Sequence, residues 1–462
     1  MTVKVVMPVR HLNLVEPLPH EGTAMRTTET AARAQARPGA VSPLIGASLR
    51  PGDVDSSMPR STRPTTPGCR TSATATATST TRTTSSALSP SADSGCEEDP
   101  FTFQDLAQAW FDCRRTKRSS ESAQAFERHA EQHLVALQEQ LFSRAWRPGR
   151  SFCFVVTQPR CREVWAAPFR DRIVHWLLYN KIAARFVSSF VHTSTACIPG
   201  RGTLFAAQQL EHQVRSLTQN WTHPAHYLKC DLANFFVSID KHVLWAELER
   251  RIPEPFWRDL AHTVLFHDPR ADYELRCPKP LLERVPPHKR LVNAPADTGL
   301  PIGNLSSQFF ANVLLNVLDQ HVKHQLRIRH YGRYVDDFYL LHEDPAHLNA
   351  CRVGLEAWLP ARLHLHLNPR KTVLQPVDRG IDFVGQVVRP WHRATRPRTV
   401  ERAIGRLRFV DRADVFTVGN SYLGLVGQAS HPHRERTRIV KVLLKRGHVA
   451  KGDFSKIYRR RK

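Results

Sequence analysis

The chain of 462 residues has few of the features that mark secreted or membrane proteins. Its nine cysteines are an odd number, they are widely scattered, and none forms a Cys-x-x-Cys pair, so the sequence predicts neither a disulfide framework nor a zinc site. No stretch approaches the ~18 continuous apolar residues of a membrane span. The apolar run within residues 1–22 is too short to be the apolar core of a signal peptide. We therefore expect a cytoplasmic protein that has no membrane partner.

Acidic residues are scarce relative to basic ones. The chain has 42 Asp and Glu against 66 Lys and Arg, which gives a net charge of +24 at pH 7. Residues 1–100 carry 10 Lys and Arg against 9 Asp and Glu, so nearly all of the excess belongs to the rest of the chain. Such an excess is expected of a protein that meets a polyanion, and charge alone leaves open whether this is nucleic acid or an acidic membrane face.

Composition changes near residue 100. Ser and Thr occupy 17 of the 30 positions from 61 to 90, and such a segment buries too little apolar surface to offset the entropy lost on ordering. Residues 1–100 are therefore predicted to be a disordered Ser/Thr/Pro-rich extension. From residue 101 the pattern is globular, and the helical spacing of apolar residues predicts two helices before residue 147.

The order of the remaining elements predicts an α+β fold in which helices cover one face of a sheet. A strand is predicted at 151–159 and a helix at 170–191. A strand that ends at Asp231 precedes a helix over 241–252, a long amphipathic helix begins near Asn304, and a pair of strands follows over 330–343. Residues 267–298 are proline-rich and weakly periodic, which predicts a long insertion loop.

Three acids lie at the ends of predicted strands. Asp336 and Asp337 are adjacent between two apolar runs, where they either lie in a solvated turn or repel one another unless a cation neutralises them. Asp231 ends the earlier strand. If the two strands are neighbours, Asp231 and Asp336 could bind the same pair of divalent ions, which is the arrangement of two-metal phosphoryl transfer. Ligand sets made only of oxygen favour Mg²⁺.

Five blocks resemble, in order and spacing, the palm motifs of reverse transcriptases: YLKCDLANFFVSID (227–240), GLPIGNLSSQFFANVLLN (299–316), YGRYVDDFYLL (331–341), LNPRKT (367–372) and RGIDFVGQV (379–387). The resemblance implies a right-hand polymerase with fingers, palm and thumb that copies RNA into DNA. It places the N-terminal helices and fingers in residues 101–226, the palm in 227–390 with the insertion loop 267–298, and a basic helical thumb in 391–462. From the 72 residues that follow the palm we expect a thumb and no appended ribonuclease H or integrase.

The resemblance also implies the catalytic residues and the cofactor. Asp231 and Asp336 would be metal ligands, with Asp337 supporting them and the backbone carbonyl of Leu232 as an added ligand, and the cofactor would be two Mg²⁺ ions. Lys371 matches the lysine proposed to protonate pyrophosphate in this family. The alternative for Lys371 is an ordinary solvated lysine.

Other matched residues imply where the nucleotide and primer bind. Arg162 and Arg170 match basic residues that hold the incoming triphosphate, although nonspecific contact with nucleic acid is the alternative. Phe236 matches the steric gate, whose ring would collide with a ribose 2′-hydroxyl, although a phenylalanine beside another could equally belong to the core. Phe383 and Gly385 lie where this family grips the primer terminus.

The second block points to a subgroup of the family. Retroviral-type enzymes have glutamine before the glycine of this block, whereas here Ile302 precedes Gly303 and the block continues to Gln308. The form Ile-Gly-x-x-x-Ser-Gln is similar to that of bacterial diversity-generating retroelement enzymes, in which the apolar residue is associated with misincorporation opposite template adenine. An isoleucine side chain cannot hydrogen-bond the incoming sugar or the template base, so the enzyme would distinguish correct from incorrect nucleotides by shape.

The resemblance therefore implies a template RNA, a primer and its cDNA, deoxynucleotides and a small accessory protein as partners. A stand-alone reverse transcriptase of anti-phage defence, or a retron-like one, is the close alternative, because the catalytic blocks are alike across these groups. A catalytically inactive RNA-binding protein that keeps the basic groove is the alternative of a different class. The three intact acids argue against it.

Overall fold

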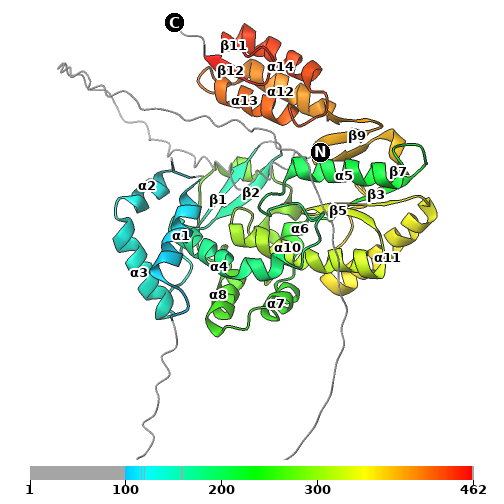
Figure 1. Cartoon of the computed structure of the whole chain (residues 1–462). Coiled ribbons are helices and arrows are strands. Elements are labelled where there is room, and N and C mark those ends of the chain that lie inside the picture. The colour runs from blue at the N-terminus through cyan, green and yellow to red at the C-terminus, as the bar shows by residue number, and fades with distance from the viewer. Residues whose placement is uncertain (1–98, 116, 119, 158–159, 460–462) are drawn as a thin grey trace, which may run out of the picture. The chain divides into compact units, whose positions relative to one another are not determined.

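The computed structural model describes residues 99–115, 117–118, 120–157 and 160–459 (Figure 1). The predicted extension 1–100 therefore lies outside the described residues apart from its last two. Where two helices were predicted the structure has three, namely α1 (Phe103–Arg114), α2 (Glu121–Glu127) and α3 (Ala130–Phe142). Thr102 begins α1 with a capping box, because its hydroxyl accepts from the Asp105 amide while the Asp105 carboxylate accepts from the Thr102 amide.

Four antiparallel strands form the central sheet, in the order β5-β6-β3-β7. Their bounds are β3 (His226–Asp231), β5 (His330–Tyr334), β6 (Asp337–His342) and β7 (Val373–Pro376). The predicted pair of strands over 330–343 is confirmed as the β5–β6 hairpin, and β3 lies beside β6 as the metal hypothesis required. Consecutive residues of β5 and β6 are buried, so this hairpin is covered on both faces rather than on the one expected face.

Helices surround this sheet and share one large apolar core with it. Close to the sheet are α5 (Thr203–Leu217), which packs on β5, and α11 (Pro345–Leu363), which packs on β3, β6 and β7. The long helix α10 (Leu305–Gln320) packs on α4 (Phe169–Val187) and α7 (Lys241–Glu249), and a π-helical turn over His321–Gln325 continues it. The short α6 (Phe235–Ser238) and α8 (Pro255–Phe266) complete this layer.

A buried polar network ties α10 to the sheet. Arg333 of β5 and Asp319 of α10 form an ion pair with 2.7 Å between guanidinium nitrogen and carboxylate oxygen, and both side chains are 0% exposed. The Tyr331 hydroxyl donates to Asp319 at 2.6 Å, and the two terminal nitrogens of Arg333 also donate to Asn312 (from Nη1) and Ser194 (from Nη2). The guanidinium is thereby satisfied on all sides, as a buried charge requires.

A second, three-stranded sheet is built mainly from residues that precede the central sheet in the sequence. Its strands are β1 (Ser151–Val156), β2 (Arg162–Ala166) and β4 (Tyr273–Leu275), and β1 pairs antiparallel with β2 and parallel with β4. Because β4 lies within 267–298, the prediction of a loop there is wrong in part. The same segment holds the helix α9 (Lys279–Glu283) and 3₁₀ turns at Pro287–Lys289 and Leu291–Asn293. The strand β4 could not be predicted from local sequence, because its partner β1 is more than 100 residues away in the chain.

The C-terminal part has its own core, whose buried residues all lie between Val400 and Ile457. Three strands, β8 (Ile381–Phe383), β9 (Gln386–Arg389) and β10 (His392–Thr395), precede it. The helices are α12 (Pro397–Phe409), α13 (Val415–Val426) and α14 (His433–Lys445), followed by the hairpin of β11 (His448–Ala450) and β12 (Ile457–Arg459). The expected basic helices are therefore present.

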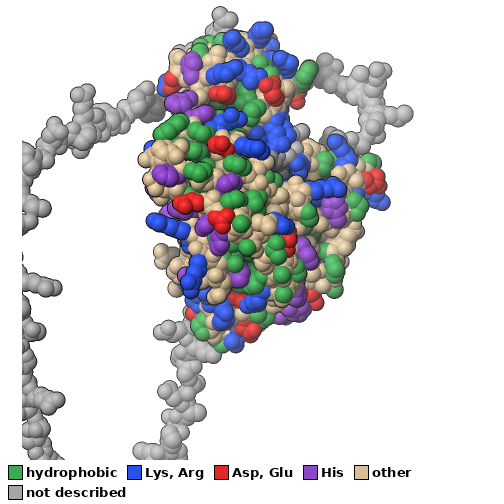
Figure 2. All heavy atoms as spheres, turned by 90° about the vertical axis from the view of Figure 1, so that its right-hand side faces the viewer, with side chains coloured by type: hydrophobic (Ala, Val, Ile, Leu, Met, Phe, Trp, Pro, Cys, Tyr) green, Lys and Arg blue, Asp and Glu red, His purple; other side chains and the backbone are tan. Residues whose placement is uncertain are grey.

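Positive charge is concentrated in this C-terminal part. Residues 391–462 contain 19 Lys and Arg against 5 Asp and Glu, which is more than half of the net charge of the chain. Figure 2 shows Lys and Arg side chains gathered over the upper part of the face that it presents. Among the described helices, none is both long and apolar enough to cross a membrane.

Candidate active site

The three acids predicted as a metal site come together where β3 and β6 end. Asp231, the last residue of β3, is the direct cross-strand partner of Asp337, the first residue of β6. Directly paired residues of antiparallel strands project to the same face, so the two carboxylates share one face of the sheet. Asp231 is only 3% exposed. Two acids at this spacing repel one another, and the pairing is therefore costly unless positive charge lies close by.

The turn between β5 and β6 has a strained shape that fixes Asp336. Val335 has a φ of 56°, in the left-handed region that β-branched residues rarely adopt. Two contacts hold the turn: the buried Arg333 donates to the Val335 carbonyl at 3.2 Å, and the Leu232 amide donates to the Asp336 carbonyl at 3.2 Å. The buried network of the sheet thus reaches directly into the acidic turn. Asp336 is held next to the end of β3, as the sequence predicted.

Lys371 supplies a positive charge at Asp231. Its Nζ lies 2.6 Å from Asp231 Oδ1, and the Asn368 side chain donates to the same oxygen at 3.2 Å. The backbone positions both residues, because the Asn368 amide donates to the Asp231 carbonyl and the Lys371 amide donates to the Asn368 carbonyl. The structure therefore brings Lys371 to the predicted site, with its side chain 40% exposed.

The donor chemistry of this site suits a hard divalent cation, since its side-chain ligands are carboxylate oxygens. Within the described ranges, however, no group of three or more His, Cys, Asp and Glu residues is arranged so that it could hold a metal ion. The prediction of two Mg²⁺ ions thus stays a prediction. Asp231, Asp336, Asp337 and the Leu232 carbonyl are the groups that would hold them.

One basic side chain of the strand β2, that of Arg162, lies within electrostatic range of the acids. Burial and the neighbouring Arg160 lower the pKa of the Arg162 guanidinium, whereas the Asp337 carboxylate raises it. Arg162 is therefore close enough to both Arg160 and Asp337 for their charges to act on it. Arg162 thus lies within range of the charge of Asp337, and its contact with a triphosphate stays a prediction.

Arg170 is not brought to this place. Its guanidinium donates to Asp171 at 3.0 Å, to the Gln140 side chain at 3.3 Å and to the Arg147 carbonyl at 2.8 Å. These partners belong to α4, α3 and the segment before β1. In the observed conformation Arg170 joins those elements, and the expectation that it contacts the triphosphate has no support from its contacts.

The predicted steric gate and the second sequence block are joined through the backbone. The Phe236 carbonyl accepts from the Leu300 amide at 2.7 Å, and the Ile302 carbonyl accepts from the Trp165 amide at 2.8 Å. Gly303 has a φ of 140°, and a Cβ placed there would lie 2.8 Å from the Trp165 carbonyl oxygen. Only glycine allows this approach. The loop 299–304 therefore links the gate to strand β2, while Phe236 itself packs partly buried against the core.

Gln308 and the predicted primer-grip residues lie in α10 and at the β8–β9 turn. Gln308, in the first turns of α10, accepts from the Cys197 thiol at 3.2 Å. Phe383 is 1% exposed and packs edge-on against Tyr339 of the central sheet. Gly385 has a φ of 90° in the β8–β9 turn, where glycine adopts the left-handed conformation without strain.

Sequence reasoning missed the contacts that hold this turn in place. Lys229 donates from Nζ to the Asp382 carbonyl at 2.7 Å, and the Asp382 carboxylate accepts from Arg396 at the start of α12. The Arg396 amide donates to the Gly385 carbonyl at 3.2 Å. Asp382 lies inside the last sequence block, so its acidity was visible, but its partners are not close to it in sequence.

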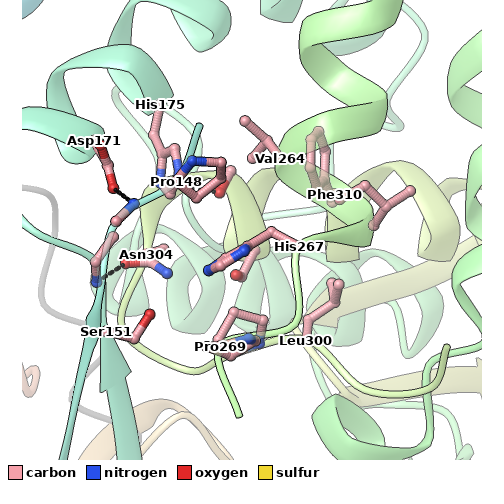
Figure 3. Close-up of a pocket in the computed structure, with 16 residues that line it drawn as sticks. Pro148, Ser151, Asp171, His175, Val264, His267, Pro269, Leu300, Asn304 and Phe310 are labelled. Carbon is pink, nitrogen blue, oxygen red and sulfur yellow. Dashed lines mark hydrogen bonds between the residues drawn. The ribbon is translucent and has the colours of Figure 1, made fainter. Parts of the chain in front are cut away.

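A small cavity, lined mainly by apolar side chains with a few polar ones, lies beside the loop 299–304 and was not predicted (Figure 3). His175 and His267 point toward it, with Ser306 and Asn304 on its wall. The Asn304 side chain accepts from the Ala167 amide at 3.1 Å, so this residue joins the loop to the segment after β2 instead of capping α10 with its side chain. Burial lowers the pKa of His175 to about 3, with His267 and Arg172 acting in the same direction.

Residues 161–388 match the family described as reverse transcriptase (RNA-dependent DNA polymerase). This range contains the whole central sheet and all five sequence blocks. The chain thus carries a reverse transcriptase domain, and the mixture of helices and antiparallel sheets fits a right-hand polymerase. The predicted α+β fold class and the nucleotidyltransferase character of this domain, that of an RNA-directed DNA polymerase, are confirmed.

Solved structures with some likeness to the chain include two yeast telomerases. One is telomerase from Candida albicans in complex with a fragment of telomeric RNA, with 14% identity, a TM-score of 0.38, and coverage of 68% of this chain and 58% of that one. The other is apo telomerase from Candida tropicalis, with 11% identity, a TM-score of 0.38, and coverage of 53% and 54%. The matches span little more than half the length of those proteins. Among curated proteins, none matches the chain.

Proposed function

We propose that this protein is an RNA-directed DNA polymerase that extends a primer on an RNA template. The observation that carries the proposal is the direct pairing of Asp231 with Asp337 across β3 and β6, beside Asp336, inside the reverse transcriptase domain. A carboxylate pair on one face, at the end of a rigid sheet, is the arrangement by which polymerases hold divalent ions for nucleotidyl transfer.

In this proposal Asp231, Asp336 and Asp337 hold two Mg²⁺ ions, which supply Lewis-acid activation of the primer 3′-hydroxyl and charge stabilisation of the leaving pyrophosphate. Arg162 binds the triphosphate from the side of β2. Lys371, which neutralises Asp231 in the observed structure, donates a proton to the departing pyrophosphate. The Phe236 ring excludes a ribose 2′-hydroxyl, while Phe383 and Gly385 position the primer end.

The test is extension of a DNA primer on a defined RNA template with the four deoxynucleotides, with Mg²⁺ and after its removal by a chelator. We expect extension that depends on Mg²⁺ and is abolished in Asp336→Ala, while that variant still binds the template. An unchanged extension rate in Asp336→Ala would contradict the assignment of the acids. RNA binding without any extension by the wild type would favour the alternative of a catalytically inactive RNA-binding protein.

We further propose that the enzyme is of the diversity-generating retroelement type and acts in the bacterial cytoplasm. The support is the block from Ile302 to Gln308, whose apolar first residue leaves the nascent pair without a hydrogen-bonding partner at that position. A structured template RNA would be the substrate, and a small acidic accessory protein would suit the basic C-terminal surface.

Base-by-base sequencing of the extension products tests this finer proposal. Errors concentrated opposite template adenine, and reduced when Ile302 is replaced by glutamine, would support it. Evenly low errors on all four template bases would favour the anti-phage defence or retron-like alternative. The second outcome would leave the polymerase function itself unaffected.

A further inference from the structure

The strand β2 lies at the edge of its sheet, whose order is β2-β1-β4, so every second amide of β2 points away from β1. The Trp165 amide is one of these, and it donates to the Ile302 carbonyl at 2.8 Å. Two residues further on, the Ala167 amide donates to the side-chain oxygen of Asn304 at 3.1 Å (Figure 3). The loop 299–304 therefore covers the open edge of β2.

The side chain of Asn304 acts here as a backbone carbonyl would. Asn304 stands two residues after Ile302, just as Ala167 stands two residues after Trp165, so the two hydrogen bonds follow one another as in a pair of parallel strands. The chain enters α10 directly after Asn304. An asparagine at this position ordinarily caps the helix, but this side chain makes no hydrogen bond to α10. Its contact with β2 replaces the capping contact.

The contact between the loop and β2 is buried and close. Asn304 and Ala167 are each 7% exposed. Between the two hydrogen bonds, a Cβ placed at Gly303 would lie 2.8 Å from the Trp165 carbonyl oxygen. A buried amide that loses its acceptor is costly. Without the Asn304 oxygen we therefore expect the loop to move until water reaches the Ala167 amide.

The other end of the loop is attached to the predicted steric gate. The Leu300 amide donates to the Phe236 carbonyl at 2.7 Å. The loop 299–304 thus spans from α6, which carries Phe236, to the edge of β2, and Ile302 lies within it. A displacement at Asn304 reaches Ile302 two residues away and, along the loop, the backbone of Phe236.

We infer that Asn304 is a positioning residue for nucleotide selection, which holds the loop 299–304 against β2 and so sets the place of Ile302 and of Phe236. The inference rests on the proposed polymerase function and adds to it a residue that acts through others rather than on the nucleotide itself. Small displacements of a binding loop are enough to weaken selection, so the contact that holds the loop is as important as the residues that it carries.

The closing experiment uses the full chain in single-nucleotide primer extension with deoxynucleotides and, separately, with ribonucleotides. It gives KM, kcat and the sugar selectivity, which is the ratio of the two kcat/KM values. In Asn304→Ala we expect KM for the deoxynucleotide to rise and the sugar selectivity to fall, each by about tenfold, as for loss of one buried hydrogen bond. Asn304→Asp keeps an acceptor oxygen at the same place and should recover most of both.

Asn316→Ala is the matched control. Asn316 lies in the last turns of the same helix and is also 7% exposed, and its side chain donates to Ser189 at 3.4 Å and accepts from Gln320 at 3.2 Å. Its loss should lower stability and change neither KM nor the sugar selectivity. A variant that only loses folded molecules lowers the apparent kcat, because the molecules that remain folded keep their KM.

Hydrogen–deuterium exchange of the free protein measures the loop without any turnover. Mass spectrometry of peptides that cover 164–168 and 299–304 should show faster exchange in Asn304→Ala than in the wild type, because the loop opens more often. Exchange of these peptides should stay near that of the wild type in Asn304→Asp and in Asn316→Ala.

The outcomes separate this inference from the proposed function. An unchanged KM and sugar selectivity in Asn304→Ala, or an equal change in Asn316→Ala, would overturn the inference and leave the function standing. Unchanged exchange of 299–304 in Asn304→Ala would overturn it too. A wild type that extends no primer would contradict the polymerase function, and faster exchange in Asn304→Ala alone would in that case still support Asn304 as the residue that holds the loop.

Discussion

Two ion pairs contact the acidic site, and they differ in burial and in the number of their hydrogen bonds. Arg333 and Asp319 are both 0% exposed, and the guanidinium makes hydrogen bonds to four residues. Lys371 is 40% exposed and makes a single contact with Asp231. One pair is therefore a fixed part of the core, whereas the other can open without disturbing the sheet.

The difference shows how the fold separates stability from chemistry. The buried pair holds the Val335 carbonyl and so shapes the turn that presents Asp336 and Asp337. In the second pair only Lys371 is exposed, so the side chain that neutralises Asp231 is able to turn toward solvent. We expect substitutions in the first pair to lower the free energy of unfolding and substitutions in the second to lower activity.

Asp231→Asn should have the largest effect on activity. The change keeps the shape of the side chain but removes its charge, and we expect kcat for primer extension to fall about 10³-fold or more, since a metal ion's stabilisation of transition-state charge is worth several kcal/mol. The urea midpoint should stay near that of the wild type, because Lys371 can turn to solvent. The exposed Asp411→Asn is the control. Equal rates for the two variants would remove Asp231 from the site.

Arg333→Met should have the largest effect on stability. Removing one partner of a buried pair leaves Asp319 charged and unpaired, which costs about 3–5 kcal/mol in the free energy of unfolding measured with urea. The matched control is Arg352→Met, because Arg352 pairs with Glu356 on an exposed helix face and its loss should cost at most about 1 kcal/mol. If both variants lose the same stability, burial does not distinguish these pairs.

Lys371→Ala should lower kcat by about 10²-fold if the lysine acts as a general acid, while changing the free energy of unfolding by about 1 kcal/mol or less. Lys371→Arg sharpens the comparison. Arginine restores the charge beside Asp231 but does not give up its proton, so it should recover the fold stability and not the rate. Full recovery of kcat by arginine would show that Lys371 acts through its charge alone.

Much of the central site could be predicted because its residues are local in sequence. Asp336 and Asp337 lie in one turn, and Asp231 ends a strand whose apolar pattern is plain. Five blocks in a fixed order then placed the strands side by side. What the sequence could not provide is the direction of long side chains: Arg170 and Arg162 come from one segment, yet the charge of Asp337 acts on Arg162 whereas Arg170 donates to Gln140.

The segment 267–298 shows the second limit. Its prolines and weak periodicity favoured a loop, but the strand β4 (Tyr273–Leu275) forms because β1 offers it an edge from a distant part of the chain. The buried Glu163 fixes the rest by accepting from Leu291 across 128 positions. Contacts of this kind are decided by tertiary packing and leave no local pattern in the sequence.

A third buried group, the imidazole of His175, is neutral at pH 7, and we expect its effect on the free energy of unfolding to be the smallest of those considered. His175 is buried at the cavity of Figure 3, where it faces Ser306, His267 and the more distant Arg172, and its pKa falls from 6.5 to about 3. Because the unfolded chain binds this proton more readily, the contribution of His175 is complete above pH 6.5. It is lost as the pH falls from 6.5 toward 3, at up to about 1.4 kcal/mol per pH unit.

Urea unfolding at pH 7.5, 6.5, 5.5 and 4.5 measures this loss. Between pH 6.5 and 4.5 the free energy of unfolding should fall more steeply for the wild type than for His175→Asn. The difference in slope corresponds to one bound proton, because the acidic groups titrate alike in both proteins. The variant is expected to be less stable than the wild type at pH 7.5 and to approach it at pH 4.5. Parallel curves for the two proteins would mean that His175 has the same pKa in the folded and unfolded states, which would contradict the lowering by burial.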